Sequence, residues 1–254
     1  MRNWRFAKYF QREPSVEISE KNGNRYLHTD SRTVQSAMKI SDPVELVLAY
    51  TKAMMGFLLF REEPEHVLMI GLGGGSLPKF VYHNIPNCRI TVVEKNHRVV
   101  MAARQYFGVP ENNERFTVIT EEGFKWLDRS RKLFDVIMVD GYDPYSPDET
   151  LATVGFYALA HDHLTEQGVL VINCWTRDRR LEKNLQNIGE VFEEMIIIPA
   201  TRKGNVALMA FKKIIQRSPQ NLIKRAKFLE NTYSLGFIEM LRDMQEKKHS
   251  TLNR

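Results

Sequence analysis

Three sets of residues in this 254-residue sequence have types and spacing suited to chemistry. Glycines recur at alternate positions in the segment Gly71-Leu-Gly-Gly-Gly75, and Ser76 follows them directly. An acid, Glu94, comes later, and two aspartates, Asp140 and Asp143, stand three residues apart. Glycines let a backbone turn tightly against a ligand, and a carboxylate can accept a hydroxyl hydrogen bond or take a proton. The pattern therefore indicates a ligand site that contains a general base.

The glycines lie between a predicted strand at 67–70 and a helix that begins near Ser76, the context in which such a loop binds ligands. A pyrophosphate fingerprint read from Gly71 needs glycine where Ser76 stands. The spacing Gly71-x-Gly73-x-Gly75 therefore favours an adenosyl sulfonium ligand. The alternative is a tight strand-to-helix turn that binds nothing.

The acids suit the same ligand. Glu94 ends the next predicted strand, where a carboxylate can accept from both hydroxyls of a ribose. Glu122, followed by Gly123, comes after the third strand and can accept from an adenine amino group; the alternative is an exposed acid that starts a helix. Asp140 and Asp143 can attract and deprotonate an amine, or can instead form a turn before Pro144.

Strands and helices alternate regularly between residues 67 and 192, which predicts a parallel sheet built by right-handed crossovers. The later strands 195–198 and 206–211 are joined too closely for a crossover, so they must be antiparallel. Together these features predict an α/β fold of the class I S-adenosylmethionine-dependent methyltransferase-like Rossmann type. The expected strands are 67–70, 90–93, 116–119, 136–139 and 169–172, and the expected helices begin near 76 and cover 99–107, 124–128, 150–164 and 181–192.

The two ends of the chain differ from this core. Strands 16–19 and 25–28 flank Asn22-Gly23, a strong hairpin signal, and a further strand covers 33–38. Helical spacing of apolar residues predicts a helix from Pro43 to Phe60, and residues 218–247 are expected to form a charged helix or helix pair. We therefore expect a small β region at 1–42, a catalytic domain at 43–213 and a helical extension at 214–254.

Composition limits the classes of function. The formal net charge is +5 at pH 7, but the basic residues gather in Arg2–Arg12 and Lys212–Lys248, which favours a solvated surface over nucleic-acid binding. Only Cys88 and Cys174 are present, without metal-ligand spacing, so we expect neither a disulfide framework nor a metal site. No apolar run long enough to span a membrane and no secretory signal is visible, which indicates a cytoplasmic protein.

Residues 25–175 resemble the spermidine synthases, the polyamine aminopropyltransferases. The most specific match is Asp140-Gly-Tyr-Asp143-Pro144, followed by a Phe-Tyr pair at 156–157. The resemblance implies aminopropyl transfer from decarboxylated S-adenosylmethionine to a polyamine, with Asp140 as the base and Asp143 holding the amine acceptor. It also implies a homodimer supported by the small β region.

Further residues receive roles from the same resemblance. Glu94 matches the acid that binds ribose, and Glu122 the acid that binds adenine. Gln35 matches a glutamine that contacts the donor's chain, and Tyr50 a tyrosine of the substrate pocket. Tyr142 replaces a small residue between the two acids and is expected to narrow the acceptor site.

Two other departures from the family pattern leave a second function open. Ser76 stands where the family has an aspartate that contacts the amino group of the decarboxylated donor, and Lys52 stands where the family has a glutamate. A serine at a helix N-terminus suits the carboxylate of intact S-adenosylmethionine better. The alternative function is therefore an S-adenosylmethionine-dependent methyltransferase that acts on a small amine or similar nucleophile. A non-catalytic adenosyl-ligand or RNA-binding protein is a third possibility, which the pair of aspartates disfavours.

Overall fold

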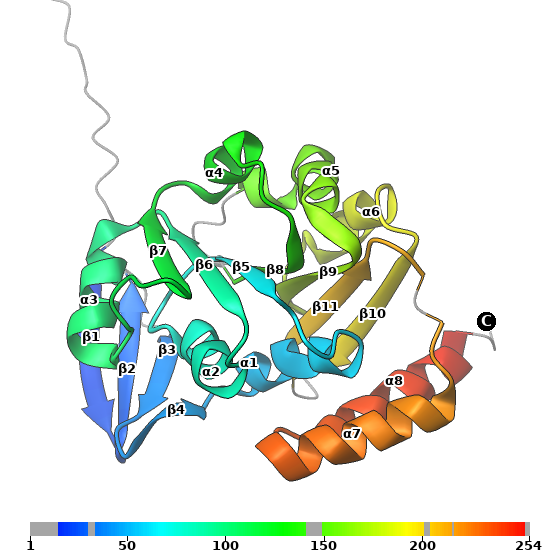
Figure 1. Ribbon diagram of the computed structural model, residues 1–254, viewed down its shortest axis with the longest axis horizontal. Helices are drawn as coiled ribbons and strands as arrows, with labels where there is room; N and C mark the ends of the chain where they lie inside the picture. The colour runs from blue at the N-terminus through cyan, green and yellow to red at the C-terminus, as the bar shows by residue number, and fades with distance from the viewer. Residues whose placement is uncertain (1–14, 30–33, 141–148, 201–203, 215, 252–254) are drawn as a thin grey trace, which may run out of the picture.

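The computed structural model describes residues 15–29, 34–140, 149–200, 204–214 and 216–251 (Figure 1). Its first unit is a small antiparallel sheet in the order β1-β2-β3-β4. As predicted, Asn22 and Gly23 form the first turn, and both have the positive φ (52° and 75°) that a tight hairpin of this kind requires. The strands are β1 (Val16–Lys21), β2 (Asn24–Thr29), β3 (Val34–Lys39) and β4 (Asp42–Leu46).

The helix predicted from Pro43 to Phe60 was wrong at its start. β4 occupies the first part and pairs with β3, and only then do α1 (Ala49–Met54) and the 3₁₀ helix η1 (Met55–Leu59) follow. Asp42 turns the chain into this strand, because its Oδ1 accepts from the backbone N–H groups of Val44 and Glu45 at 3.2 and 3.3 Å. Leu46 is only 1% exposed, as the predicted helix also required, but it is buried as the last residue of β4.

The main sheet has the predicted seven strands in the order β10-β11-β9-β8-β5-β6-β7. The strands from β5 to β9 are mutually parallel, whereas β11 is antiparallel to both β9 and β10. The chain adds β6 and β7 on one side of β5, and then β8 and β9 on the other side. The order of the strands therefore reverses at β5, and open α/β sheets bind ligands at such a switch point. The strands are β5 (His66–Ile70), β6 (Arg89–Glu94), β7 (Phe116–Thr120), β8 (Phe134–Val139), β9 (Leu164–Trp175), β10 (Glu194–Pro199) and β11 (Asn205–Phe211).

Helices cover both faces of this sheet, because alternate strand residues point to opposite sides. On β5, Val67 and Met69 join the core beneath α1, α2, α3 and the C-terminal helices, while Leu68 and Ile70 join the core beneath α4, α5 and α6. Figure 1 shows α4, α5 and α6 along the upper side and α7 and α8 at the lower right. The helices are α2 (Ser76–Asn84), α3 (His97–Phe107), α4 (Gly123–Arg129), α5 (Val154–Asp162), α6 (Leu181–Gly189), α7 (Pro219–Tyr233) and α8 (Phe237–Thr251).

The helix predicted at 150–164 is interrupted. A short 3₁₀ helix, η2 (Glu149–Ala152), precedes α5, and Thr153 separates the two by capping α5 through a bond from Phe156 N to its hydroxyl at 3.1 Å. Leu164 already belongs to β9. Within the described part of the chain, no helix has both the length and the apolar character to cross a membrane.

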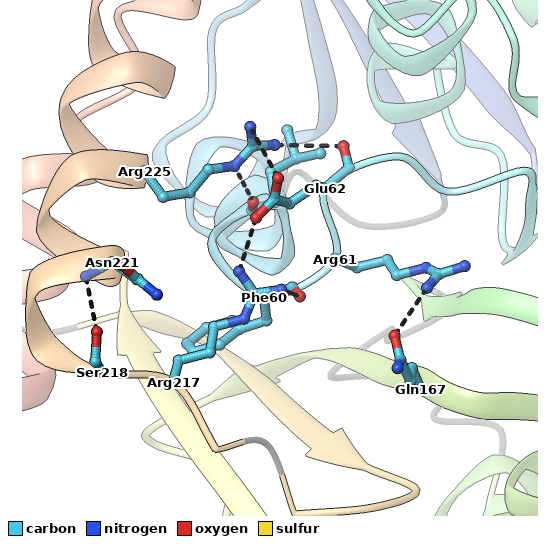
Figure 2. Close-up of polar contacts among 9 residues, drawn as sticks. Phe60, Arg61, Glu62, Gln167, Arg217, Ser218, Asn221 and Arg225 are labelled. Carbon is cyan, nitrogen blue, oxygen red and sulfur yellow. Dashed lines mark hydrogen bonds and ion pairs between the residues drawn. The ribbon is translucent and has the colours of Figure 1, made fainter.

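The C-terminal helix pair is fastened to the end of η1 by two arginines (Figure 2). Arg225 donates from Nε to the carbonyl of Leu58 at 3.1 Å, and Arg217 donates from Nη1 to Glu62 Oε1 at 3.0 Å and also to the carbonyl of Phe60. These bonds to main-chain carbonyls fix α7 against the same side of the sheet as α1.

Candidate active site

The glycine loop lies between β5 and α2, as predicted, and its backbone needs glycine. Gly71, Gly73 and Gly75 all have positive φ, at 96°, 52° and 70°. The loop is tied to the neighbouring strand, because Gly71 N donates to the carbonyl of Val93 at 2.9 Å. The loop therefore starts beside the end of β6, at the carboxyl edge of the sheet.

Gly75→Ala is expected to destabilise the protein more than the same change at Gly108. Both residues have left-handed φ (70° and 66°), but an added Cβ at Gly75 would lie 2.3 Å from Val109 Cγ2, whereas at Gly108 it would meet nothing within 4 Å. Left-handed φ costs an alanine about 1–2 kcal/mol, and overpacking adds about 1–3 kcal/mol. Urea unfolding of both variants measures the difference, and equal losses would contradict the close packing of Gly75.

Glu94 ends β6 and faces the glycine loop. Its Oε2 accepts from Leu72 N and its Oε1 from Asn96 N, both at 2.9 Å. Burial raises the pKa of this carboxyl, and the backbone donors, including the N–H of Gly73, oppose the rise. Each oxygen has a further lone pair, so the carboxylate can still accept from a ligand hydroxyl.

Ser76, 9% exposed, bonds within the protein. Its hydroxyl donates to the carbonyl of Ala37 at 3.2 Å and lies 3.3 Å from the hydroxyl of Ser36. The helix is capped by Gly75, without a side-chain bond. Ser76 thus connects α2 to β3 of the small sheet. Its hydroxyl proton, which could have bonded a ligand carboxylate, is donated to the carbonyl of Ala37 instead.

Asp140 directly follows β8 and lies against the end of β5, because its N–H donates to the carbonyl of Ile70 at 2.9 Å. Its carboxylate accepts from Tyr50 Oη at 3.0 Å and from Asn173 Nδ2 at 2.8 Å. Burial raises the pKa of Asp140 to about 6, and the charge of Glu94 adds to the rise, while the two hydrogen bonds oppose it. A carboxylate with this pKa is ionised at neutral pH and is a stronger base than an ordinary aspartate.

Tyr50, from α1, joins Asp140 to the small sheet. Its hydroxyl also lies 3.4 Å from the carbonyl of Gln35 on β3, so it has two acceptors for its single proton. Burial, followed by the negative charge of Asp140, raises the pKa of Tyr50 well above its ordinary value, so the phenol remains a donor. The backbone carbonyl of Gln35 and the carboxylate of Asp140 therefore lie on either side of the same hydroxyl.

Glu122 and Gly123 lie at the start of α4. Glu122 caps this helix, with Oε1 accepting from Phe124 N at 2.8 Å and Oε2 from Lys125 N at 2.9 Å. An added Cβ at Gly123 would lie 2.5 Å from Ile70 Cγ2, so glycine allows α4 to approach the end of β5. Both bonds of Glu122 are those of an acid that starts a helix, which was the alternative to adenine binding. The carboxylate oxygens of Glu122 still have lone pairs that can accept from a ligand.

Two predicted residues, Tyr142 and Asp143, lie outside the described residues. Two others were missed by sequence reasoning: Asn173, which bonds Asp140, and Asn205, whose Nδ2 donates to Asn173 Oδ1 at 2.8 Å. A signal for Asn173 existed, since an amide inside the apolar stretch 169–175 of β9 needs a buried partner. Among the described side chains, no three His, Cys, Asp or Glu residues are grouped as a metal ion would require.

Comparison with known proteins identifies the family. The model of the spermine/spermidine synthase domain matches residues 47–219. The chain belongs to the spermine/spermidine synthase family. Within this family, a polyamine aminopropyltransferase from Chromobacterium violaceum is 38% identical over 94% of this chain and 92% of its own length. A polyamine aminopropyltransferase from Neisseria meningitidis serogroup A is 40% identical over 90% of this chain and 88% of its own.

Solved structures share the fold of this family member. A probable spermidine synthase from Corynebacterium glutamicum has a TM-score of 0.73 at 18% identity, over 86% of this chain and 83% of its own. A spermidine synthase in complex with the transition-state analogue AdoDATO has a TM-score of 0.63 at 19% identity, over 85% and 79%. Human methyltransferase-like protein 13 in complex with SAH has a TM-score of 0.67 at 28% identity, over 74% and 93%. The class I methyltransferase-like fold predicted from the sequence is thus confirmed.

Proposed function

We propose that this family member is an aminopropyltransferase that moves the aminopropyl group of decarboxylated S-adenosylmethionine to a polyamine acceptor. The observation that carries the proposal is the carboxylate of Asp140, which has a pKa raised to about 6 and lies at the switch point of the sheet. The relatives that match most of the chain are named polyamine aminopropyltransferases. Incubation with this donor and putrescine, followed by identification of the products, tests the proposal.

The reaction gives Asp140 the role of base. The nitrogen of the acceptor attacks the aminopropyl carbon next to the sulfonium, a C–N bond forms, and the C–S bond breaks with its electron pair passing to sulfur. The acceptor nitrogen loses one proton, which passes to the carboxylate of Asp140 and then to water. Asp140 can accept that proton because it is ionised at neutral pH, and Tyr50 holds its orientation through the bond at 3.0 Å.

The donor's nucleoside would be held at the adjoining strand ends. Glu94 would accept the ribose hydroxyls beside Gly71–Gly75, and Glu122 with Gly123 would face the adenine. Gln35 would contact the donor's chain. Asp143 and Tyr142 would line the acceptor site, with Asp143 attracting the second amine of the polyamine.

Methyl transfer from intact S-adenosylmethionine is the alternative, and it is not favoured. The closely matching relatives are named for aminopropyl transfer, while human methyltransferase-like protein 13 matches at 28% identity. The alternative also depended on the Ser76 hydroxyl, which donates to the carbonyl of Ala37.

Ser76→Ala is expected to weaken the binding of both donors by a similar factor. The change removes the bond from Ser76 to the carbonyl of Ala37 that joins α2 to β3. A lost hydrogen bond of this kind costs about 0.5–1.5 kcal/mol, and the loss should loosen the glycine loop, which would hold either donor. Calorimetric titration of the wild type and the variant with each donor gives the ratio of affinities, which should remain unchanged. Ser36→Ala is the control. It removes the neighbouring hydroxyl on β3 but leaves the bond from Ser76 to the carbonyl of Ala37, so it should weaken donor binding less. A selective loss of affinity for intact S-adenosylmethionine would show that the hydroxyl reaches the ligand's carboxylate.

We also infer a cytoplasmic homodimer that uses no metal and does not bind nucleic acid. The location follows from the expected chemistry of polyamine formation and from the two buried free thiols, Cys88 and Cys174. The dimer follows from the family's use of its small β region. Sedimentation analysis at several protein concentrations tests the assembly.

A further inference from the structure

Two asparagines continue the hydrogen bonding of Asp140 across the sheet, away from β5 and the glycine loop. Asn173 Nδ2 donates to Asp140 Oδ1 at 2.8 Å, and Asn205 Nδ2 donates to Asn173 Oδ1 at 2.8 Å. Val139 and Ile172 are the last paired residues of β8 and β9, and Asp140 and Asn173 each follow one of them. Asn205 begins β11, on the other side of β9. The bonds therefore connect three neighbouring strands at the carboxyl edge of the sheet.

The direction of these bonds follows from the charge of Asp140. An ionised carboxylate can only accept, so Asn173 must turn its NH₂ group towards Asp140 and its carbonyl towards Asn205. That carbonyl also only accepts, so Asn205 must turn its own NH₂ group towards it. Both amides thus point donors in one direction, towards the anion.

Burial gives this arrangement an energetic consequence. Asn173 is 7% exposed and stands in an apolar strand, where a valine or leucine would pack without needing partners. Burial alone disfavours the ionised form of Asp140, and the bond from Asn173 is the largest effect that opposes it. Tyr50 from α1 and Glu94 from β6 are the other titratable groups that act on this carboxylate among the described residues.

We propose that Asn173 and Asn205 are positioning residues of the reaction, a two-amide relay that keeps the carboxylate of Asp140 ionised and fixed in orientation. The proposal rests on the role of Asp140 as base given above. Asn173 acts directly on Oδ1, and Asn205 acts through Asn173 by holding its amide in the required orientation. Neither residue is needed to touch the reacting atoms.

The relay also determines which oxygen takes the proton. Oδ1 accepts from an amide whose orientation is held by Asn205, so the proton from the acceptor nitrogen is placed on Oδ2. There Tyr50 can respond, because its hydroxyl can turn its proton to the carbonyl of Gln35, 3.4 Å away, and accept from protonated Asp140. The carboxyl can thus change charge without leaving a buried group unpaired.

The test compares Asn173→Leu, Asn205→Leu and the double variant with the wild type. Leucine has nearly the shape of asparagine and removes both donor and acceptor. With ¹³C-labelled aspartate, NMR follows the ionisation of the Asp140 side chain, assigned by its absence in Asp140→Asn, without any substrate. Asn187→Leu is the matched control, because this amide donates to the carbonyl of Ala152 at 2.8 Å rather than to a carboxylate.

Asn173→Leu should raise the midpoint of the NMR titration of the Asp140 carboxyl by about one pH unit or more, because the ionised form loses a hydrogen bond. Asn205→Leu should raise it less, and should add nothing in the Asn173→Leu background, because its effect passes through Asn173. The acidic limb of the kcat/KM profile should move with the midpoint, and Asn187→Leu should move neither.

An unchanged midpoint in Asn173→Leu, or additive shifts in the double variant, would overturn the relay. If Asn173→Leu does not fold, Asn205→Leu decides, because it must still raise the midpoint. The titration needs no activity, so the two proposals fail separately. Shifted midpoints in a protein that transfers no aminopropyl group would sink the proposed function alone, and unmoved midpoints in an active enzyme would sink the relay alone.

Discussion

Replacing Asp140 by asparagine is expected to lower kcat/KM for the amine acceptor by about 10²–10⁴-fold, the usual contribution of a general base. The neutral amide has the shape of the carboxylate and can accept from Asn173, but it cannot take a proton. Calorimetry should show that donor binding changes far less than turnover. Activity within a few-fold of the wild type would remove Asp140 from the chemistry.

The same variant should be more stable than the wild type at pH 8. The pKa of Asp140 is raised from 3.8 to about 6 in the folded protein, so its ionised form destabilises the fold above pH 6. Removing that charge should stabilise the protein by about 1–3 kcal/mol at pH 8, and the gain should disappear as the pH falls towards 4.

A matched control lies on the same strand. Asp135, at the other end of β8, pairs with Arg61 at 2.5 Å and also accepts from Glu65 N at 2.7 Å. Asp135→Asn removes a buried carboxylate that pairs with the half-buried Arg61, so it should destabilise the protein. Urea unfolding of both variants at both pH values gives the comparison. A loss of stability in Asp140→Asn at pH 8 would contradict a strained, catalytically tuned carboxylate.

Glu94→Ala is expected to weaken the binding of adenosyl ligands by roughly tenfold or more. A site built to accept from ribose hydroxyls loses its charged acceptor, which typically costs about 1.5–3 kcal/mol. The change also leaves the N–H groups of Leu72 and Asn96 without their carboxylate, so the glycine loop should loosen. Isothermal titration with S-adenosylhomocysteine measures the affinity.

Glu121→Ala separates the loss of the ribose contact from a general loss of negative charge. Glu121 follows the neighbouring strand β7, and its side chain pairs with Arg129 rather than with the loop. Its removal should leave the affinity nearly unchanged. If both variants bind equally well, or if Glu94→Ala binds as tightly as the wild type, Glu94 does not hold the ribose.

Local patterns in the sequence were enough to predict the central fold. The apolar run before Gly71 and the acid that ends the next strand are local signals, and the structure places Glu94 directly against the glycine loop through the bond to Leu72 N. The antiparallel end of the sheet also followed from a local feature, the short connection before Asn205.

Features set by distant partners could not be predicted in the same way. Leu46 suits a helix as well as a strand, and only pairing with Met38 on β3 decides between them. Asn173 bonds Asp140 because β8 and β9 are in register, and Asn205 reaches it only because β11 runs antiparallel beside β9. The role of Ser76 depended in the same way on a carbonyl from the small sheet, that of Ala37.

The most direct measurement is product analysis by mass spectrometry after incubation with each donor, with and without putrescine. Decarboxylated S-adenosylmethionine with putrescine should yield spermidine and methylthioadenosine, and Asp140→Asn should yield almost none under the same conditions. Intact S-adenosylmethionine should yield no methylated amine. Formation of S-adenosylhomocysteine and a methylated amine, with no aminopropylated product from the decarboxylated donor, would contradict aminopropyl transfer.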